Sequence, residues 1–217
     1  IDINKSVRLE ENNVERTSQT FNYAHKEDEE LQNMIEKTTS CVVGISKIKN
    51  TGSTIFLNDG VGELGLGSGV IVTENGYILS NEHVTGKKFS NCYVTLEDGR
   101  SYKANVVWSN SSLDLSICKI NMTGLTYATL GSSENIKVGQ AVYAIGNPIG
   151  FEFQRTVTAG IISAVNRTIK LEEKQENEIK VSYMDDLIQT DATINQGNSG
   201  GPVSYTHLRA HETGRNL

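Results

Sequence analysis

The sequence has few cysteines, few histidines, no basic stripe and no long apolar run, and each shortage excludes a class of function. Its three cysteines, Cys41, Cys92 and Cys118, are an odd and sparse set, which excludes a disulfide framework. No pair of them has the spacing of metal ligands and no cluster of histidine and cysteine exists, so we expect neither a metal ion nor another cofactor. No run approaches the roughly 18–20 apolar residues of a membrane span.

Charge and length set further limits. The formal net charge is −6, and without a basic patch we expect no binding to nucleic acid. A chain of 217 residues is long enough for one domain with a sizeable core. Because the sequence begins with Ile1 rather than Met, we expect a fragment or a processed product, so the missing signal or anchor segment excludes no location.

A glycine-rich stretch around Ser199, residues 191–203, reads D-A-T-I-N-Q-G-N-S-G-G-P-V. Glycines on both sides of the serine allow positive φ and a sharp turn. Across Gly197, Asn198 and Ser199, such a turn can direct the amides of Gly197 and Ser199 at one point, as an oxyanion hole requires. A serine hydroxyl is a poor nucleophile without a base. Since a plain glycine-rich turn is the alternative, the rest of the chain has to supply a base and an acid.

Only four histidines could serve as the base: His25, His83, His207 and His211. His25 lies in a charged run before any core-forming segment, and the last two lie in a polar tail. His83 follows two short apolar strands joined by a turn, which place it at a strand end. A core or surface histidine is the alternative, but elimination favours a functional role for His83.

Asp114 is the best candidate for the acid, because it starts an apolar strand and a carboxylate among leucines is costly to bury without a partner. Asp98 lies in a hairpin-turn signal, Glu97-Asp98-Gly99-Arg100. The order His83, Asp114, Ser199 excludes the α/β-hydrolase elbow, which the G-x-S-x-G pattern also matches, because those enzymes run serine, acid, histidine.

Several ordered motifs together resemble the HtrA (Do-like) serine proteases. They are GSGVIV at 67–72, GYILSNEHV at 76–84, DLS at 114–116, the central strands at 139–150 and 156–164, and the serine block at 189–202. The similarity covers roughly residues 31–203. It implies an all-β fold with a chymotrypsin-like double β-barrel and a serine endopeptidase that acts on unfolded proteins. Its triad would be His83, Asp114 and Ser199.

Comparison with trypsin-like digestive enzymes refines the expected specificity. Those enzymes carry an aspartate before the serine that pairs with a newly cut N-terminus, whereas this chain has Asn198, so we expect no activation by cleavage. Arg- and Lys-specific relatives place an acid about six residues before the nucleophile, where this chain has Thr193. We therefore expect an uncharged substrate pocket of Thr193 and Ile194, and cleavage after small or medium apolar residues.

The chain divides into three expected segments. Residues 1–26 are predicted to be a polar linker, 27–203 the protease domain and 204–217 a non-native tail. Within the domain we expect a short helix at 27–38, a first barrel at about 41–120 and a second at about 134–203. The family continues past Val203 with further strands, so we expect an incomplete second barrel with an unpaired edge.

The resemblance also implies partners and a location. We expect unfolded polypeptide substrates, a homotrimer in the full-length protein, an extracytoplasmic and membrane-anchored or cell-surface setting, and a C-terminal PDZ domain that this chain lacks. Phe21 and Tyr23 would either pack locally or build the trimer contact. Residues 170–180 would be a solvated hairpin tip or a regulatory loop. The alternative functions are a non-catalytic chaperone-like binding module and an inactive truncated fragment.

Overall fold

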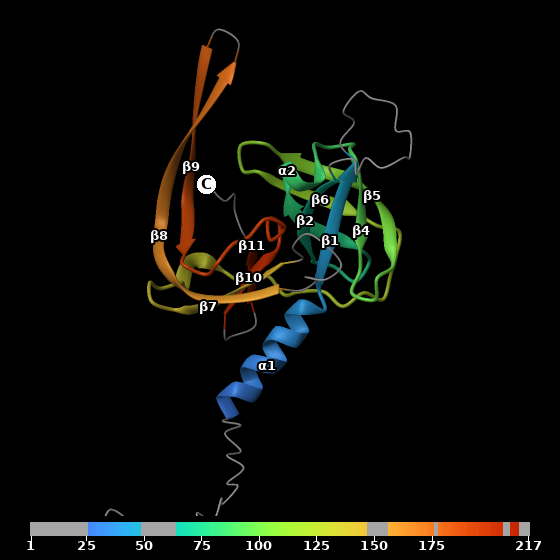
Figure 1. Cartoon of the computed structure of the whole chain (residues 1–217), viewed down its shortest axis with the longest axis vertical. Coiled ribbons are helices and arrows are strands. Elements are labelled where there is room, and N and C mark those ends of the chain that lie inside the picture. Colours follow the sequence, from blue (N-terminus) through green and yellow to red (C-terminus); the bar gives the residue numbers. More distant parts are fainter. Residues whose placement is uncertain (1–25, 49–63, 147–155, 176–177, 206–208, 213–217) are drawn as a thin grey trace, which may run out of the picture.

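The computed structural model describes residues 26–48, 64–146, 156–175, 178–205 and 209–212. Most of the predicted linker, with Phe21, Tyr23 and His25, lies outside these ranges, as does His207. The described chain is mostly β-structure in two parts, a closed barrel and an open sheet, with helix α1 (Lys26–Thr39) before them. The all-β prediction is therefore confirmed, and Figure 1 shows the two parts side by side.

The first part is a closed barrel in the order β1-β2-β3-β6-β5-β4. Its strands are β1 (Val42–Ile48), β2 (Leu64–Ile71), β3 (Tyr77–Asn81), β4 (Asn91–Thr95), β5 (Ser101–Asn110) and β6 (Leu115–Lys119). Alternate residues point inward, as in the buried Cys92 and Val94 of β4 with exposed neighbours. The core also contains Val43, Ile45, Ile78, Val106 and Ile120.

The second part is an open sheet in the order β11-β10-β7-β8-β9. Its strands are β7 (Ala141–Gly146), β8 (Thr156–Gln175), β9 (Glu178–Thr190), β10 (Pro202–Tyr205) and β11 (Arg209–Glu212), and a 3-10 turn η1 (Ser133–Asn135) precedes them. This half-barrel agrees with the expected incomplete second barrel. Within the described residues the open sheet ends in the edge strands β9 and β11, and β10 pairs with β11 from Pro202↔Glu212 to Tyr205↔Arg209.

The described residues of the charged segment, 170–175 and 178–180, belong to the paired strands β8 and β9. Strands β8 and β9 stay paired from Lys170↔Tyr183 to Gln175↔Glu178. Figure 1 shows this ribbon projecting well beyond the two β-structures. The pairing agrees with the hairpin interpretation, and the regulatory role stays a prediction.

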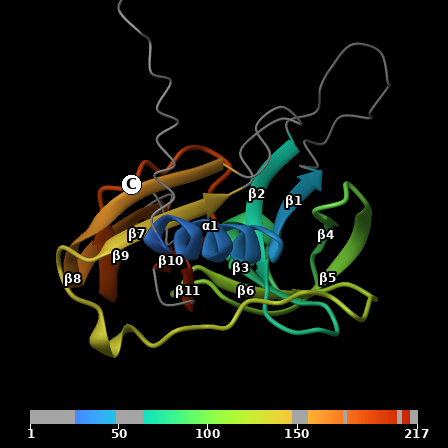
Figure 2. The same cartoon turned by 90° about the horizontal axis from the view of Figure 1, so that it is seen from below.

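Helix α1 confirms the predicted helix at 27–38 to within one residue at each end. Its Met34 is buried, and the Ser204 hydroxyl of β10 lies 3.0 Å from the Met34 sulfur. Figure 2 shows α1 lying across the junction of the two β-structures. Among the described residues, no helix has the length and apolarity needed to cross a membrane.

Candidate active site

His83 lies in a one-turn helix, α2 (Glu82–Thr85), which directly follows β3. The sequence predicted a strand end at this point, and the structure adds the helical turn. The helix is anchored from within the barrel, because the buried Thr85 hydroxyl donates to Ser116 Oγ at 2.6 Å. Gly86, with φ +93°, ends the helix in a conformation that favours glycine. The His83 side chain is 40% exposed, so its ring is open to a substrate.

Asp114 is brought to His83 by the strand pairing of β3 with β6. Its Oδ2 lies 2.6 Å from His83 Nδ1, and its Oδ1 accepts the His83 backbone amide at 3.0 Å. The residue has a positive φ of 51°, which is unusual for a non-glycine residue. Its carbonyl accepts the Asn81 side-chain amide at 2.9 Å and the Glu82 backbone amide at 3.1 Å. These bonds hold the strained backbone in place.

The carboxylate determines the protonation pattern of the imidazole. A carboxylate oxygen at Nδ1 favours the tautomer with the proton on that nitrogen, so Nε2 is left as a proton acceptor. The Asp114 side chain is only 13% exposed, which limits competition from water for the contact. The pair can therefore act as a general base and stabilise the imidazolium that forms.

The turn before Ser199 has the features of a type II turn. The amide of Asn198 donates to the carbonyl of Asn195 at 3.0 Å, and Gly197 has φ +101°. Asn198 therefore places the turn rather than supplying a donor to an oxyanion, and its side chain is fully buried. Among the described residues, the amides of Gly197 and Ser199 have no acceptor, as an oxyanion hole requires.

Ser199 and Val84, the residue after His83, both border Gly67 of β2. A Cβ built on Gly67 would lie 2.6 Å from a methyl carbon of Val84, the neighbour of His83, and 3.1 Å from the carbonyl oxygen of Ser199. Within the described residues no hydrogen bond joins the His83 ring to the Ser199 hydroxyl. Catalytic hydrogen bonds are often long without substrate and tighten in the complex, so this geometry is compatible with a triad.

The predicted pocket residues Thr193 and Ile194 follow a segment that β8 supports. Thr158 donates its hydroxyl to the Thr193 carbonyl at 2.7 Å, and the Ile161 amide donates to Asp191 Oδ1 at 2.6 Å. Thr193 is exposed and Ile194 is half-buried. The negative charge nearest in sequence, Asp191, is thus bonded to backbone.

Ser68, which no sequence pattern singled out as a site residue, contacts the serine turn. Its hydroxyl donates to the Gly197 carbonyl at 2.7 Å and its amide donates to the Ser199 carbonyl at 2.8 Å. The available signal was the glycine on each side of it, since glycine inside a strand indicates close approach of another backbone. The sequence pattern placed Gly67 and Gly69 only within the GSGVIV motif at 67–72.

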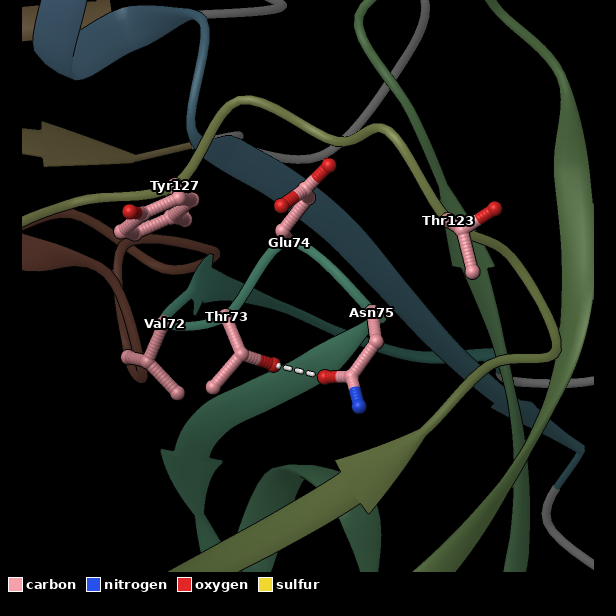
Figure 3. A pocket seen from close by; sticks show the side chains of 6 residues that line it. All are labelled: Val72, Thr73, Glu74, Asn75, Thr123 and Tyr127. Atoms are coloured by element: carbon pink, nitrogen blue, oxygen red, sulfur yellow. Dashed lines mark hydrogen bonds between the residues drawn. The ribbon is translucent and has the colours of Figure 1, made fainter.

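All three cysteines are buried and free. Within the described ranges, no group of three or more histidine, cysteine, aspartate or glutamate side chains could hold a metal ion. An open groove of about 600 Å³ lies elsewhere on the barrel. Figure 3 shows its lining residues, Val72, Thr73, Glu74, Asn75, Thr123 and Tyr127. None of the predicted catalytic residues lines this groove.

Similarity to known proteins identifies the family. The trypsin-like peptidase domain family matches residues 67–206. The chain belongs to the trypsin-like peptidase family. A "Serine protease Do-like HtrA" of Bacillus subtilis is 37% identical to this chain over 195 residues, which is 85% of this chain and 42% of the relative. A "Probable periplasmic serine endoprotease DegP-like" of Chlamydia pneumoniae is 44% identical over 140 residues, which is 63% of this chain and 26% of the relative.

Solved structures match as well. An "HtrA-type protease AlgW with tripeptide" has a TM-score of 0.64 and 36% identity, and the match covers 82% of this chain and 52% of that one. The structure of Deg5 has a TM-score of 0.65 and 30% identity, and the match covers 87% of this chain and 85% of that one. These findings confirm the resemblance to HtrA-like proteases. The chain spans about a quarter to two-fifths of the length of the two relatives named above.

Proposed function

We propose that the chain is the serine endopeptidase domain of an HtrA-like protease, hydrolysing peptide bonds of unfolded or misfolded proteins. The observation that carries this proposal is the double contact of Asp114 with His83, at 2.6 Å to Nδ1 and 3.0 Å from the backbone amide. The contact prepares the imidazole as a base beside the turn that carries Ser199. The names of the HtrA and DegP-like relatives support the same reaction.

In the proposed mechanism, Ser199 Oγ attacks the peptide carbonyl carbon. Its proton passes to His83 Nε2 as the new C–O bond forms, and the carbonyl electron pair moves onto the oxygen. The amides of Gly197 and Ser199 bind that oxyanion. When the intermediate collapses, the C–N bond breaks and the imidazolium gives its proton to the leaving amine. Water then repeats the sequence on the acyl-enzyme, with His83 again as the base.

The pocket is expected to accept small or medium apolar side chains. Thr193 occupies the position where an acid would select arginine or lysine, and Ile194 is half-buried beside it. Asp191, the nearest acid in sequence, accepts the Ile161 amide at 2.6 Å. A pocket without free charge favours residues such as Val, Ala or Ile at the cleaved position.

The location, assembly and binding partners of the whole protein are part of the same proposal. The DegP-like relatives are named periplasmic, which supports an extracytoplasmic location. A homotrimer, a membrane anchor and a PDZ domain in the full-length protein are further proposals that follow from the HtrA resemblance. Unfolded polypeptides would be the binding partners.

Cleavage of an unfolded protein tests the proposal. The chain is incubated with reduced and alkylated lactalbumin and, as a control, with the folded disulfide-bonded form. We expect cleavage of the unfolded form, and a rate lower by about six orders of magnitude for Ser199→Ala. Binding of the unfolded form without cleavage by the wild type would instead support the chaperone-like module. Equal turnover by Ser199→Ala would remove Ser199 from the mechanism.

A further inference from the structure

Ser68 connects the barrel that carries His83 to the turn that carries Ser199. It lies on β2 and is fully buried. Its hydroxyl donates to Gly197 O at 2.7 Å, and its amide donates to Ser199 O at 2.8 Å. Its own carbonyl accepts the hydroxyl of Ser80, on β3, at 2.7 Å. Strand β3 leads directly into α2, which carries His83. The bonds of Ser68 therefore connect β3, next to His83, with the turn that carries Ser199.

The bonds around the turn determine where its amides point. In a trans peptide the C=O and N–H groups point in opposite directions. The peptide between Gly197 and Asn198 is fixed at both ends, by the Ser68 hydroxyl and by the Asn195 carbonyl. The Asn198 carbonyl accepts the Gly201 amide at 2.9 Å, so the Ser199 amide is turned to the other side.

The approach of β2 to the turn depends on the small residues around Ser68. A Cβ on Gly67 would lie 3.1 Å from the Ser199 carbonyl oxygen. A Cβ on Gly200, which has φ +83°, would collide with the Ser68 carbonyl and the Ser80 hydroxyl. The turn and the strand are thus in direct backbone contact, and a side-chain hydroxyl at Ser68 reaches Gly197 without an intervening water.

We propose that Ser68 is a positioning residue for the oxyanion hole. It does not touch the substrate; it holds the Gly197 carbonyl, and through it the orientation of the amides of Gly197 and Ser199. The inference rests on the proposed function, since an oxyanion hole matters only to an acyl-transfer enzyme. The amide of Ser68 keeps its bond to Ser199 whatever the side chain, so the hydroxyl bond to Gly197 is the contact that a substitution removes.

Ser68→Ala tests the proposal by separating transition-state binding from substrate binding. We expect kcat on a peptide substrate to fall about ten- to hundredfold with KM unchanged, somewhat less than the loss of an entire oxyanion donor. Affinity for a peptide aldehyde, whose hemiacetal oxygen occupies the oxyanion position, should fall by the same factor. Affinity for the cleaved product peptide, which forms no oxyanion, should stay unchanged.

Two further variants keep the test independent of folding. Ser204→Ala also removes a buried serine hydroxyl, one that contacts Met34 away from the turn, and it should leave kcat unchanged. Ser68→Cys keeps a similar volume but offers only a weak S–H donor, so its kcat should also fall about ten- to hundredfold. This variant carries the test if Ser68→Ala does not fold. Thermal unfolding of each variant identifies any loss that comes from instability.

Two results overturn the proposal. One is a wild-type kcat in a folded Ser68 variant, and the other is an equal fall in affinity for the aldehyde and the product peptide, which would show a general loss of the site. Absence of cleavage and of Ser199 acylation in the folded wild type would instead overturn the proposed function, and the role of Ser68 with it.

Discussion

Asp114 contacts His83 through both of its carboxylate oxygens. Oδ1 accepts the backbone amide of His83 at 3.0 Å, and Oδ2 lies 2.6 Å from Nδ1. One carboxylate therefore fixes the start of helix α2 and the rotation of the imidazole. With Nδ1 occupied, Nε2 is the nitrogen that faces the nucleophile in the proposed mechanism.

Asp114→Asn should lower kcat by about ten-thousandfold with little loss of stability, because an amide favours the wrong imidazole tautomer while it still fills the site. Steady-state kinetics and thermal unfolding measure the two effects. Asp98→Asn is the matched control, since Asp98 lies in an exposed turn beside Arg100, and its kcat should equal that of the wild type. A loss of less than tenfold for Asp114→Asn would contradict the role given to this carboxylate.

Gly67→Ala should impair both folding and catalysis. The added methyl would meet Val84 at 2.6 Å and the Ser199 carbonyl at 3.1 Å, so α2 or the serine turn has to move. Overpacking of this kind costs about 1–3 kcal/mol, and a displacement near 1 Å can lower the rate about a hundredfold. Denaturant titration and kcat/KM measure the two effects.

Gly99→Ala is the control for that substitution. Gly99 has φ +83° and nothing within 4 Å of an added Cβ, so the cost is backbone strain of about 1–2 kcal/mol without contact to the site. Its kcat/KM should stay at the wild-type value. If Gly67→Ala keeps wild-type kcat/KM as well, the site does not depend on the close approach of β2.

Thr193→Asp should change the preferred residue at the cleaved position. A carboxylate there would favour arginine over valine, since the wild-type pocket is expected to contain no free charge. Paired peptides that differ only in Arg or Val at this position report the ratio of their kcat/KM values, which should shift toward Arg at least tenfold, a change of about 1.4 kcal/mol. An unchanged ratio would place the pocket elsewhere.

The three thiols should be unreactive in the folded chain. All three are buried. A hydrogen bond from Cys118 lowers the pKa of Cys92, so that thiol is protected by its burial alone. Burial raises the pKa of Cys41, and the hydrogen bond with Cys92, together with burial, raises the pKa of Cys118. A raised pKa leaves less thiolate, the reactive form, at a given pH. With a thiol-disulfide reagent at pH near 8 we expect no fast reaction in the native state and three equivalents after unfolding; one fast native equivalent would contradict the buried placement.

The order of the chemistry-bearing residues and the all-β class could be predicted from the sequence, because both depend on local patterns. The predicted helix at 27–38 corresponds to α1, and the apolar strand predicted to start at Asp114 corresponds to β6. The histidine and aspartate that the sequence selected lie together at 2.6 Å.

Other features depend on tertiary context. A one-turn helix such as α2 is too short to show a period, so His83 was expected at a strand end. The charges at 170–180 indicated a hairpin tip, but the extent of the β8–β9 pairing, from Ile162↔Thr190 to Gln175↔Glu178, could not be predicted from them. The contact of Ser68 with Gly197 joins residues 129 positions apart, and the flanking glycines indicate a close backbone approach without indicating which segment approaches.

Site-specific labelling by a fluorophosphonate tests the central claim, that Ser199 is a nucleophile activated by His83. The native chain, His83→Ala and Ser199→Ala are treated with the probe, and the modified residue is located by peptide mass spectrometry. We expect one adduct, on Ser199, in the native chain, and none or slow labelling in either variant. A folded chain that stays unmodified, or labelling at Ser199 that is equally fast without the imidazole, would contradict the account.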